Sequence, residues 1–407
     1  MPPKSFAAGD FLTFSNPRTE ALSGSRGGLL RAKMPELDSL RGIACLMVLF
    51  FHGFANRYIP EHLNGVERIF VGMCRYGFTG VNLFFVLSGF LITGILLETR
   101  HKTDYYRRFY IRRALRILPL YYGILLLLIV VWRAGLTDRP FSWAFLGFSA
   151  IYLANTTPLF DVPIQFGVLW SLAVEEHFYL LWPALVQRLR TKALVILAFV
   201  LCVAALGFRF TAFHFGSDVF GFYTWMVCDG LSMGALLAIA IRHFHQSRRV
   251  MLRIATLAFA YAVLCAVVER FATARYTGAA LQISGSNAFY GATLIAALLL
   301  GSRYGIRSRV LEFFGEISYG LYLVHMLVFD IFDALARRHF PVLAPGHLTF
   351  PLASVRFGIV AAVAVGSAWL SRWYFEEPFL RLKDRFASDH HSARDREMEP
   401  IPGEAAA

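Results

Sequence analysis

The chain has 407 residues, of which 57% are hydrophobic and only 16% are charged, and its formal net charge is +13. Soluble proteins normally carry about a quarter charged residues, so this composition excludes an ordinary soluble protein and indicates a polytopic membrane protein. The basic residues cluster in short loops between apolar runs, which the positive-inside rule explains, so no nucleic-acid partner is predicted. The five cysteines include no CxxC pair, and neither a disulfide framework nor a metal site is predicted.

Apolar runs predict an all-α fold of about ten membrane-spanning helices. The predicted spans are residues 38–56, 77–97, 117–133, 168–187, 192–209, 224–241, 251–268, 286–301, 313–336 and 354–375. A further apolar piece, 141–155, is short for a span and is predicted to be re-entrant or interfacial. If that piece did cross the membrane, the count would be eleven and every later loop would change sides.

Loop charge predicts the orientation of the chain. With ten spans, one side of the membrane holds 28 of the 40 Lys and Arg residues and the other side holds 11. This bias predicts that both termini are cytoplasmic, in what we expect to be a bacterial inner membrane. Residues 1–35 and 386–407 are polar and are predicted to be disordered tails on either side of a membrane domain, residues 36–385.

The first span, "LDSLRGIACLMVLFFHGF", carries Arg41 and His52. Eleven residues make almost three complete helical turns, so the two side chains share one face, about 16 Å apart along the axis. Ionisable groups inside spans are costly and mark functional sites by default, although a single histidine can also be a hydrogen-bonded core residue.

At the start of the third span, "YYRRFYIRRALRILPLYY" places Arg113 and Arg116 three residues apart on a helix, so both can reach one anion. Guanidinium groups suit phosphate, and coenzyme A is a common phosphorylated acyl carrier of the cytoplasm. We interpret the preceding Arg107 and Arg108 as ordinary interfacial anchors.

Two later spans carry titratable groups at a similar calculated depth. Glu175, in "LWSLAVEEHFYLLWP", lies about 10 Å from the outer edge of a core about 30 Å thick, and His325, in "EISYGLYLVH", lies about 15 Å from the inner edge. Each can instead stabilise helix contacts through an ion pair or a hydrogen bond. Ser88 in the second span is more typical of helix packing than of a nucleophile. In "YFEEPF", Glu376 and Glu377 are expected to pair with Arg41 or with the Arg113 cluster.

These motifs, in this order, resemble the acyltransferase-3 family of integral-membrane O-acyltransferases. The matching strings are "LDSLRGIACLMVLFFH", "GVNLFFVLSGFLITGIL", "FYIRRALRILPLYY", "LWSLAVEEHFYLLWP", "CDGLSMGALLA", "EISYGLYLVH" and "YFEEPF", which lie within residues 36–385. The resemblance implies a ten-helix enzyme that takes an acyl group, often acetyl, from cytoplasmic acyl-CoA. The acceptor would be a hydroxyl of an envelope polysaccharide, a lipid-linked sugar or a secreted metabolite.

The resemblance also implies roles for individual residues. Catalysis falls on His52, Glu175 and His325, with His52 as the base and Glu175 or His325 orienting it, either by direct transfer or through an acyl-histidine. Binding of acyl-CoA falls on Arg41, Arg113 and Arg116. The expected partners are acyl-CoA, a carbohydrate acceptor and membrane lipid, with no metal cofactor.

The chain departs from the family pattern at three points. Asn82 replaces a residue that is often acidic, and Val227 replaces an arginine that normally precedes Asp229 by two places. Many relatives carry an additional hydrolase-like domain after the last span. We see no such domain in this sequence and therefore expect a stand-alone form. The alternative function is a secondary transporter or flippase, in which the same intramembrane charges would line a permeation path.

Overall fold

The computed structural model describes residues 30–31, 34–55, 63–214, 221–245, 247–272, 275–305, 307–344 and 348–382. These described residues form helices joined by loops and contain no strand, which confirms the all-α prediction. Of the predicted tails, only residues 30, 31, 34 and 35 are described, so the prediction of disorder for 1–35 and 386–407 otherwise falls outside the described residues.

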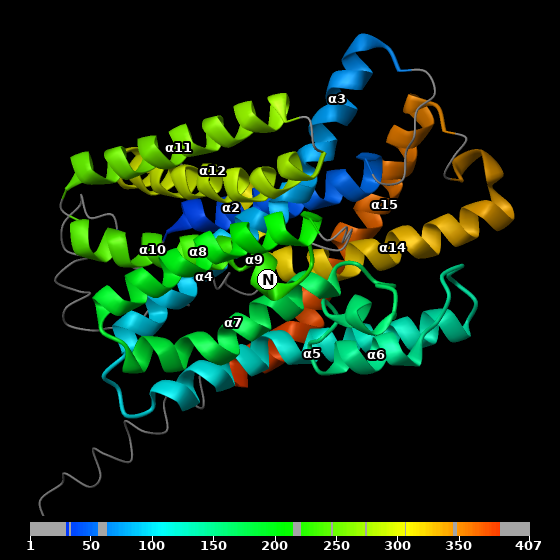
Figure 1. Cartoon of the computed structure of the whole chain (residues 1–407). Coiled ribbons are helices and arrows are strands. Elements are labelled where there is room, and N and C mark those ends of the chain that lie inside the picture. The colour runs from blue at the N-terminus through cyan, green and yellow to red at the C-terminus, as the bar shows by residue number, and fades with distance from the viewer. Residues whose placement is uncertain are drawn as a thin grey trace, which may run out of the picture.

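Most helices lie side by side along one long direction of the molecule (Figure 1). The N-terminal half contains α2 (Pro35–Phe50), the π-helical turn η2 (Phe51–Ala55), α3 (Gly65–Arg75), η3 (Tyr76–Thr79), α4 (Gly80–Thr99), α5 (Tyr105–Arg133), α6 (Trp143–Ala150), η4 (Thr157–Phe160) and α7 (Leu169–Arg188). The C-terminal half contains α8 (Thr191–His214), α9 (Thr224–Val227), α10 (Asp229–Phe244), α11 (Arg248–Phe271), α12 (Arg275–Tyr304), α13 (Arg309–Glu316), α14 (Ser318–His339), η5 (Pro341–Leu343), α15 (Phe350–Leu370) and η6 (Ser371–Glu376).

Each of the ten predicted spans falls on a helix, and the chain is a polytopic membrane protein. Within the described residues, eight helical stretches are long and apolar enough to cross a membrane: Pro35–Ala55, Gly65–Thr99, Tyr105–Arg133, Thr191–Ala212, Arg248–Phe271, Gly278–Tyr304, Ser318–His339 and Phe350–Leu382. The other two predicted spans correspond to α7, which carries two glutamates, and to α10, which has only 16 residues. Ten is therefore an approximate count.

The apolar piece 141–155 does not span. Its helix α6 has eight residues, a length of about 12 Å, which is too short for a core about 30 Å thick. The hydroxyl groups of Tyr121 and Tyr122 donate to the carbonyl oxygens of Ser149 and Ala150 at 2.7 and 2.9 Å, so α6 lies against α5 (Figure 1).

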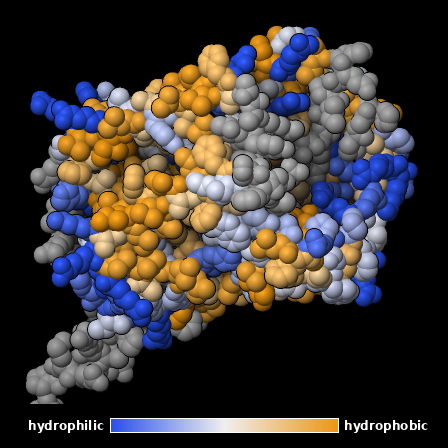
Figure 2. All heavy atoms as spheres, viewed as in Figure 1, coloured by the Kyte–Doolittle hydropathy of each residue, from blue (hydrophilic) through white to orange (hydrophobic). Residues whose placement is uncertain are grey.

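On the face shown in Figure 2, apolar residues predominate in the middle of the bundle and hydrophilic residues gather towards its two ends. Exposed apolar side chains on α8 and α11 include Ile196, Phe199, Leu257 and Phe259. Such a surface suits lipid tails in the middle of a bilayer and water or head groups at its faces.

Glycines bring helix backbones together inside the bundle. A Cβ atom on Gly89 of α4 would lie 1.9 Å from the carbonyl oxygen of Leu231, and one on Gly234 of α10 would lie 2.1 Å from that of Val86. Both contacts are impossible for any larger residue, so α4 and α10 require glycine where they cross. Close packing through small residues is a common basis of helix association in membranes.

Candidate active site

A pair of histidines joins α14 to the end of α2. The chain after α2 continues as the π-helical turn Phe51–Ala55, which contains His52, and such turns often occur at functional sites. Nε2 of His325 lies 3.1 Å from Nδ1 of His52. The two histidines, 273 residues apart in sequence, therefore lie at one depth, as predicted.

Backbone carbonyls determine the tautomers of this pair. Nδ1 of His52 lies 3.0 Å from the oxygen of Val48, and Nδ1 of His325 lies 2.9 Å from the oxygen of Leu321. A carbonyl oxygen only accepts, so both Nδ1 atoms must carry a proton. The one Nδ1–H of His52 is then shared between the oxygen of Val48 and Nε2 of His325, and neutral His52 has its lone pair on Nε2, the form in which an imidazole acts as a base.

A pocket lies among α2, α4, α5, α7 and α14, with about 700 Å³ of empty space that includes its opening to the outside, and we call it the central cavity. Its walls combine polar and apolar side chains: Arg41, Val81, Phe84, Phe85, Ser88, Arg113, Arg116, Ile117, Ser171, Leu172, Glu175, Glu176, Tyr179, Ser318, Tyr319 and Tyr322. Three arginines face two glutamates, so the cavity suits an anionic ligand that also presents hydrogen-bond donors. All three arginines predicted to bind the donor line this one space.

Glu175 is held by α4 and by its own helix. The hydroxyl of Ser88 donates to Oε1 of Glu175 at 2.6 Å, and the hydroxyl of Tyr179 donates to Oγ of Ser88 at 3.2 Å. The guanidinium of Arg113 lies 4.8 Å from the centre of the Tyr179 ring. This array connects a carboxylate, two hydroxyls and a cation along one wall of the central cavity.

Glu175 does not share the depth of the histidine pair. Tyr322 of the cavity wall meets Ser171 with 2.5 Å between their hydroxyl oxygens, and α7 and α14 run in opposite directions from that contact. That contact is made by the tip of a long side chain, whereas the backbones of α2 and α4 meet where Gly80 packs between Ala44 and Val48. Ser88 and the Glu175 that it binds therefore lie about 20 Å from His52 along the helices. The calculated coincidence of depth was wrong for Glu175, because α7 begins below the outer edge assumed for it.

A second, smaller pocket adjoins the arginine end, with about 400 Å³ of empty space that includes its opening to the outside. It is lined by Ile95, Thr99, Tyr105, Arg108, Phe109, Arg112 and Arg113. Arg113 lines both cavities, so the arginine cluster extends from the central cavity towards the start of α5. Arg108, interpreted from the sequence as an anchor, lines this space and also pairs with Asp104 at 2.9 Å. The close spacing of arginines along α5 is the sequence signal that could have placed Arg108 with the arginine cluster.

Comparison with known families decides the identity of the fold. The model of the acyltransferase-3 family, described as an acyltransferase domain, matches residues 34–372. The chain belongs to this family. No solved structure matches it.

Curated relatives of this acyltransferase-3 chain include proteins of Bacillus subtilis, Listeria monocytogenes and Staphylococcus aureus. The Bacillus subtilis protein "Putative peptidoglycan O-acetyltransferase YrhL" is 30% identical over 326 residues, which cover 72% of this chain and 48% of that protein. "Peptidoglycan O-acetyltransferase OatA" of Listeria monocytogenes is 32% identical over 171 residues, 38% of this chain and 24% of that protein. "O-acetyltransferase OatA" of Staphylococcus aureus is 30% identical over 195 residues, 43% and 29% respectively. The matched parts span less than half the length of these relatives.

The structure shows what replaces the missing family residues. The amide of Asn82 donates to Oδ1 of Asn287 at 2.9 Å, a neutral link between α4 and α12. Asp229 has a partner after all, because Arg209 of α8 binds its carboxylate through both terminal nitrogens, at 3.2 and 2.8 Å. The side chains of Arg209 and Asp229 are 0% and 4% exposed. Sequence reasoning missed Arg209 because it lies 20 residues before Asp229, on another helix.

The expected pairing of the last glutamates holds in part, because Glu376 lies close enough to Arg116 of the arginine cluster for their charges to interact, whereas Glu377 pairs elsewhere. Arg372 and Arg381 bind the carboxylate of Glu377 at 2.6 and 3.1 Å, and both lie close to it along the chain. Glu376 is buried and accepts a hydrogen bond from Ser371 at 3.3 Å. Among the three arginines predicted to bind acyl-CoA, Arg41 pairs with Asp38 on its own helix at 3.1 Å.

Proposed function

We propose that this chain is a membrane O-acetyltransferase that moves an acetyl group from acetyl-CoA to a hydroxyl of an envelope polysaccharide or lipid-linked sugar. Family membership supports acyl transfer, and the names of the relatives support acetyl and a cell-wall glycan. The observation that carries the proposal is the contact between His52 and His325, which do not line the central cavity; the His325 ring lies 6.0 Å from the ring of Tyr322, on the wall of that arginine-lined space. A base and a phosphate-binding group are the two elements that this reaction needs.

The geometry suggests the following course for the reaction. Arg113 and Arg116 hold the phosphates of the donor, and its arm extends past Tyr322 to His52. Nε2 of His52 takes the proton of the acceptor hydroxyl while the hydroxyl oxygen attacks the thioester carbonyl carbon. The carbon–sulfur bond breaks, and the imidazolium returns the proton to the departing thiolate. His325 accepts a hydrogen bond from Nδ1–H of His52 and thereby stabilises the imidazolium.

The orientation belongs to the same proposal. We infer that the arginine end of α5 faces the cytoplasm, where acetyl-CoA is made, and that both termini lie on that side of a bacterial inner membrane. The glycan then approaches the histidine pair from the opposite face. The loop-charge bias supports this orientation.

Replacement of His52 tests the function directly. Purified protein with acetyl-CoA should release CoA thiol slowly, and His52→Ala should lower the rate of release and transfer by about 10²–10⁴-fold. Binding of CoA, measured by calorimetry, should be unchanged. His339→Ala, which removes an exposed histidine at the end of α14, is the matched control.

Two outcomes would contradict the proposal. A His52→Ala protein that keeps more than about a tenth of the normal rate does not use His52 as its base. Movement of a glycan or ion across vesicles by the wild type, without release of thiol, would support the transporter instead.

A further inference from the structure

The helix α3, Gly65–Arg75, lies at the end of α4 opposite the arginine cluster. The far end of α4, Thr99, lines the smaller pocket with Arg108, Arg112 and Arg113. At 20 residues α4 is about 30 Å long and crosses the core by itself, so α3 is not needed for a span. Figure 1 shows α3 pointing away from the bundle, across the direction in which α11 and α12 run. Its surroundings therefore differ from those of the spanning helices.

The helix α3 has three sides of different chemistry. Val66, Ile69 and Met73 project from one side and are 78%, 66% and 62% exposed. Arg68 and Arg75 project from a second side and are also exposed. The third side packs on the protein and consists of Phe70, Val71 and Cys74. At 100° per residue, the centres of the three sides are about 100–140° apart, so α3 meets three different environments.

The buried side of α3 indicates its level in the membrane. The ring of Phe70 lies 5.8 Å from that of Phe350, in the first turn of α15. This turn begins the last stretch that is long and apolar enough to span, Phe350–Leu382, whose exposed side includes Val355 and Ile359. The helix α3 therefore lies beside the end of a lipid-facing span, where acyl chains give way to head groups.

The same buried side contacts the turn that carries His52. The ring of Phe70 meets the rings of Phe54 and Phe50 edge-on, with 5.1 and 6.3 Å between ring centres. Phe54 lies in the π-helical turn, two residues after His52, and is 2% exposed. The position of α3 therefore affects the position of this turn.

We propose that α3 lies in the lipid interface on the side opposite the arginine cluster, where it binds phospholipid and holds the turn of His52 in place. Its apolar side contacts the upper acyl chains, and Arg68 and Arg75 reach the phosphate groups, which suit guanidinium groups. Amphipathic helices with a basic side bind membrane surfaces in this way. Exposed apolar patches mark contact with a membrane or a protein, and the place beside α15 favours the membrane. The part that concerns His52 rests on the proposed function.

Nitroxide labels on α3 test the lipid contact without an enzymatic assay. They are attached singly, in nanodiscs of phosphatidylethanolamine and phosphatidylglycerol, to a variant without the five native cysteines. Labels at Ile69→Cys and Met73→Cys should collide more with oxygen, which concentrates in lipid, than with a water-soluble nickel complex. Arg68→Cys and Arg75→Cys, the matched controls, should show the reverse. Preference for nickel at all four positions would overturn the proposal. Spin–spin broadening at Ile69→Cys would also overturn it, because a second copy would then cover the apolar side.

Turnover in the protein with its native cysteines provides a second measurement. Ile69→Asp with Met73→Asp places two charges among acyl chains and should lower kcat for thiol release by at least about tenfold, since a misplaced reacting group can cost about 100-fold. The KM for acetyl-CoA should not change. Ile69→Leu with Met73→Leu, the matched control, should keep the normal rate. Equal rates for the two variants would overturn the link to His52. Absence of thiol release from wild type would refute the acetyltransferase, whereas the labelling result would stand.

Discussion

The histidine pair shows how neighbouring residues decide the chemistry of a single side chain. His52 receives its tautomer from the carbonyl of Val48, and His325 receives its own from Leu321. These tautomers set the direction of the hydrogen bond between the two rings, in which Nδ1–H of His52 donates to Nε2 of His325. In the proposed reaction, His325 acts through His52 and is a positioning residue.

His325→Ala tests that role. The variant should lower kcat by at least about tenfold, because the imidazolium of His52 loses a hydrogen bond, and should leave the affinity for CoA unchanged. Steady-state kinetics with saturating acetyl-CoA and calorimetry with CoA are the measurements. His325→Gln, which retains a side-chain acceptor, should recover part of the rate. Equal rates for all three proteins would contradict the assignment.

Arg113 provides a second prediction at the scale of one residue. Arg113→Ala should raise the KM for acetyl-CoA by about 10- to 150-fold, the value of one charge-assisted contact, with little change in the KM for the acceptor. Initial rates measured while each substrate is varied in turn separate the two constants. A change confined to the acceptor would place the phosphates elsewhere.

Sequence reasoning at this scale succeeded where spacing along one helix was sufficient. The convergence of Arg113 and Arg116 needs only the helical period, and both line the central cavity. The shared face of Arg41 and His52 stays a prediction, because Arg41 lines that cavity and His52 lies in the π-helical turn after α2. The contact of Glu175 with Ser88 depends on how α7 slides against α4, and 87 residues separate the two. No local sequence pattern specifies how two distant helices are aligned, so the depth of Glu175 was predicted wrongly.

At the scale of helices, Arg209 of α8 binds Asp229 of α10 in place of the arginine that the family usually has two residues before Asp229. Arg209 also donates to the carbonyl of Met226 and the hydroxyl of Ser284, so one buried cation joins α8 to the start of α10 and to α12. Burial without a partner is costly for either charge, whereas removing both charges together can be nearly neutral.

A double-mutant cycle tests this link. Arg209→Leu and Asp229→Leu should each destabilise the protein by about 3–5 kcal/mol, because each leaves a buried charge unpaired, and the double variant should be more stable than either. Thermal unfolding in detergent, followed by circular dichroism, measures the three effects. Strictly additive losses would mean that the two side chains do not depend on each other.

The elements themselves were largely predictable, but their irregularities were not. Apolar length located a helix for each predicted span. The π-helical turn that carries His52 and the additional helix α3 before α4 were absent from the prediction. Hydropathy measures the average of a window, so it does not register one widened turn. The helix α3 is amphipathic and begins with a capping box at Asn64 and Glu67, which is a local signal that the prediction did not use.

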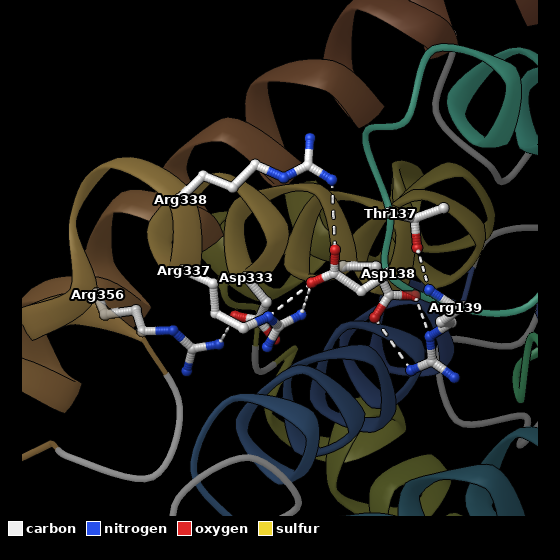
Figure 3. Close-up of polar contacts among 8 residues, drawn as sticks. Thr137, Asp138, Arg139, Asp333, Arg337, Arg338 and Arg356 are labelled. Atoms are coloured by element: carbon white, nitrogen blue, oxygen red, sulfur yellow. Dashed lines mark hydrogen bonds and ion pairs between the residues drawn. The ribbon is translucent and has the colours of Figure 1, made fainter.

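For the whole molecule, polar groups at the ends and apolar groups around the middle agree with a transmembrane orientation (Figure 2). The end of α14 opposite the arginine cluster has its own charge network, in which Asp138 and Arg139 of the loop after α5 bind α14 (Figure 3). Arg337 binds Asp138 at 2.6 Å, Arg139 binds Asp330 at 2.8 Å, and buried Arg356 binds Asp333. These arginines belong to the less basic side of the charge count, and their carboxylate partners offset them.

The orientation of the whole chain can be tested through one exposed loop at each end of α5. Thr103 is exposed before α5, and Pro140 is exposed after it. The helix has 29 residues, about 43 Å, so these two positions lie on opposite sides of a membrane. In a variant without the five native cysteines, Thr103→Cys should resist a membrane-impermeant thiol reagent added to intact cells and react after lysis, and Pro140→Cys should react in both conditions.

The reason for this expected result is the positive-inside bias, since seven Lys and Arg residues lie between positions 98 and 116. Labelling of Thr103→Cys in intact cells, with protection of Pro140→Cys, would reverse the orientation and put the arginine-lined entrance on the side without acetyl-CoA. The donor proposed here would then be wrong, whatever the histidine pair does.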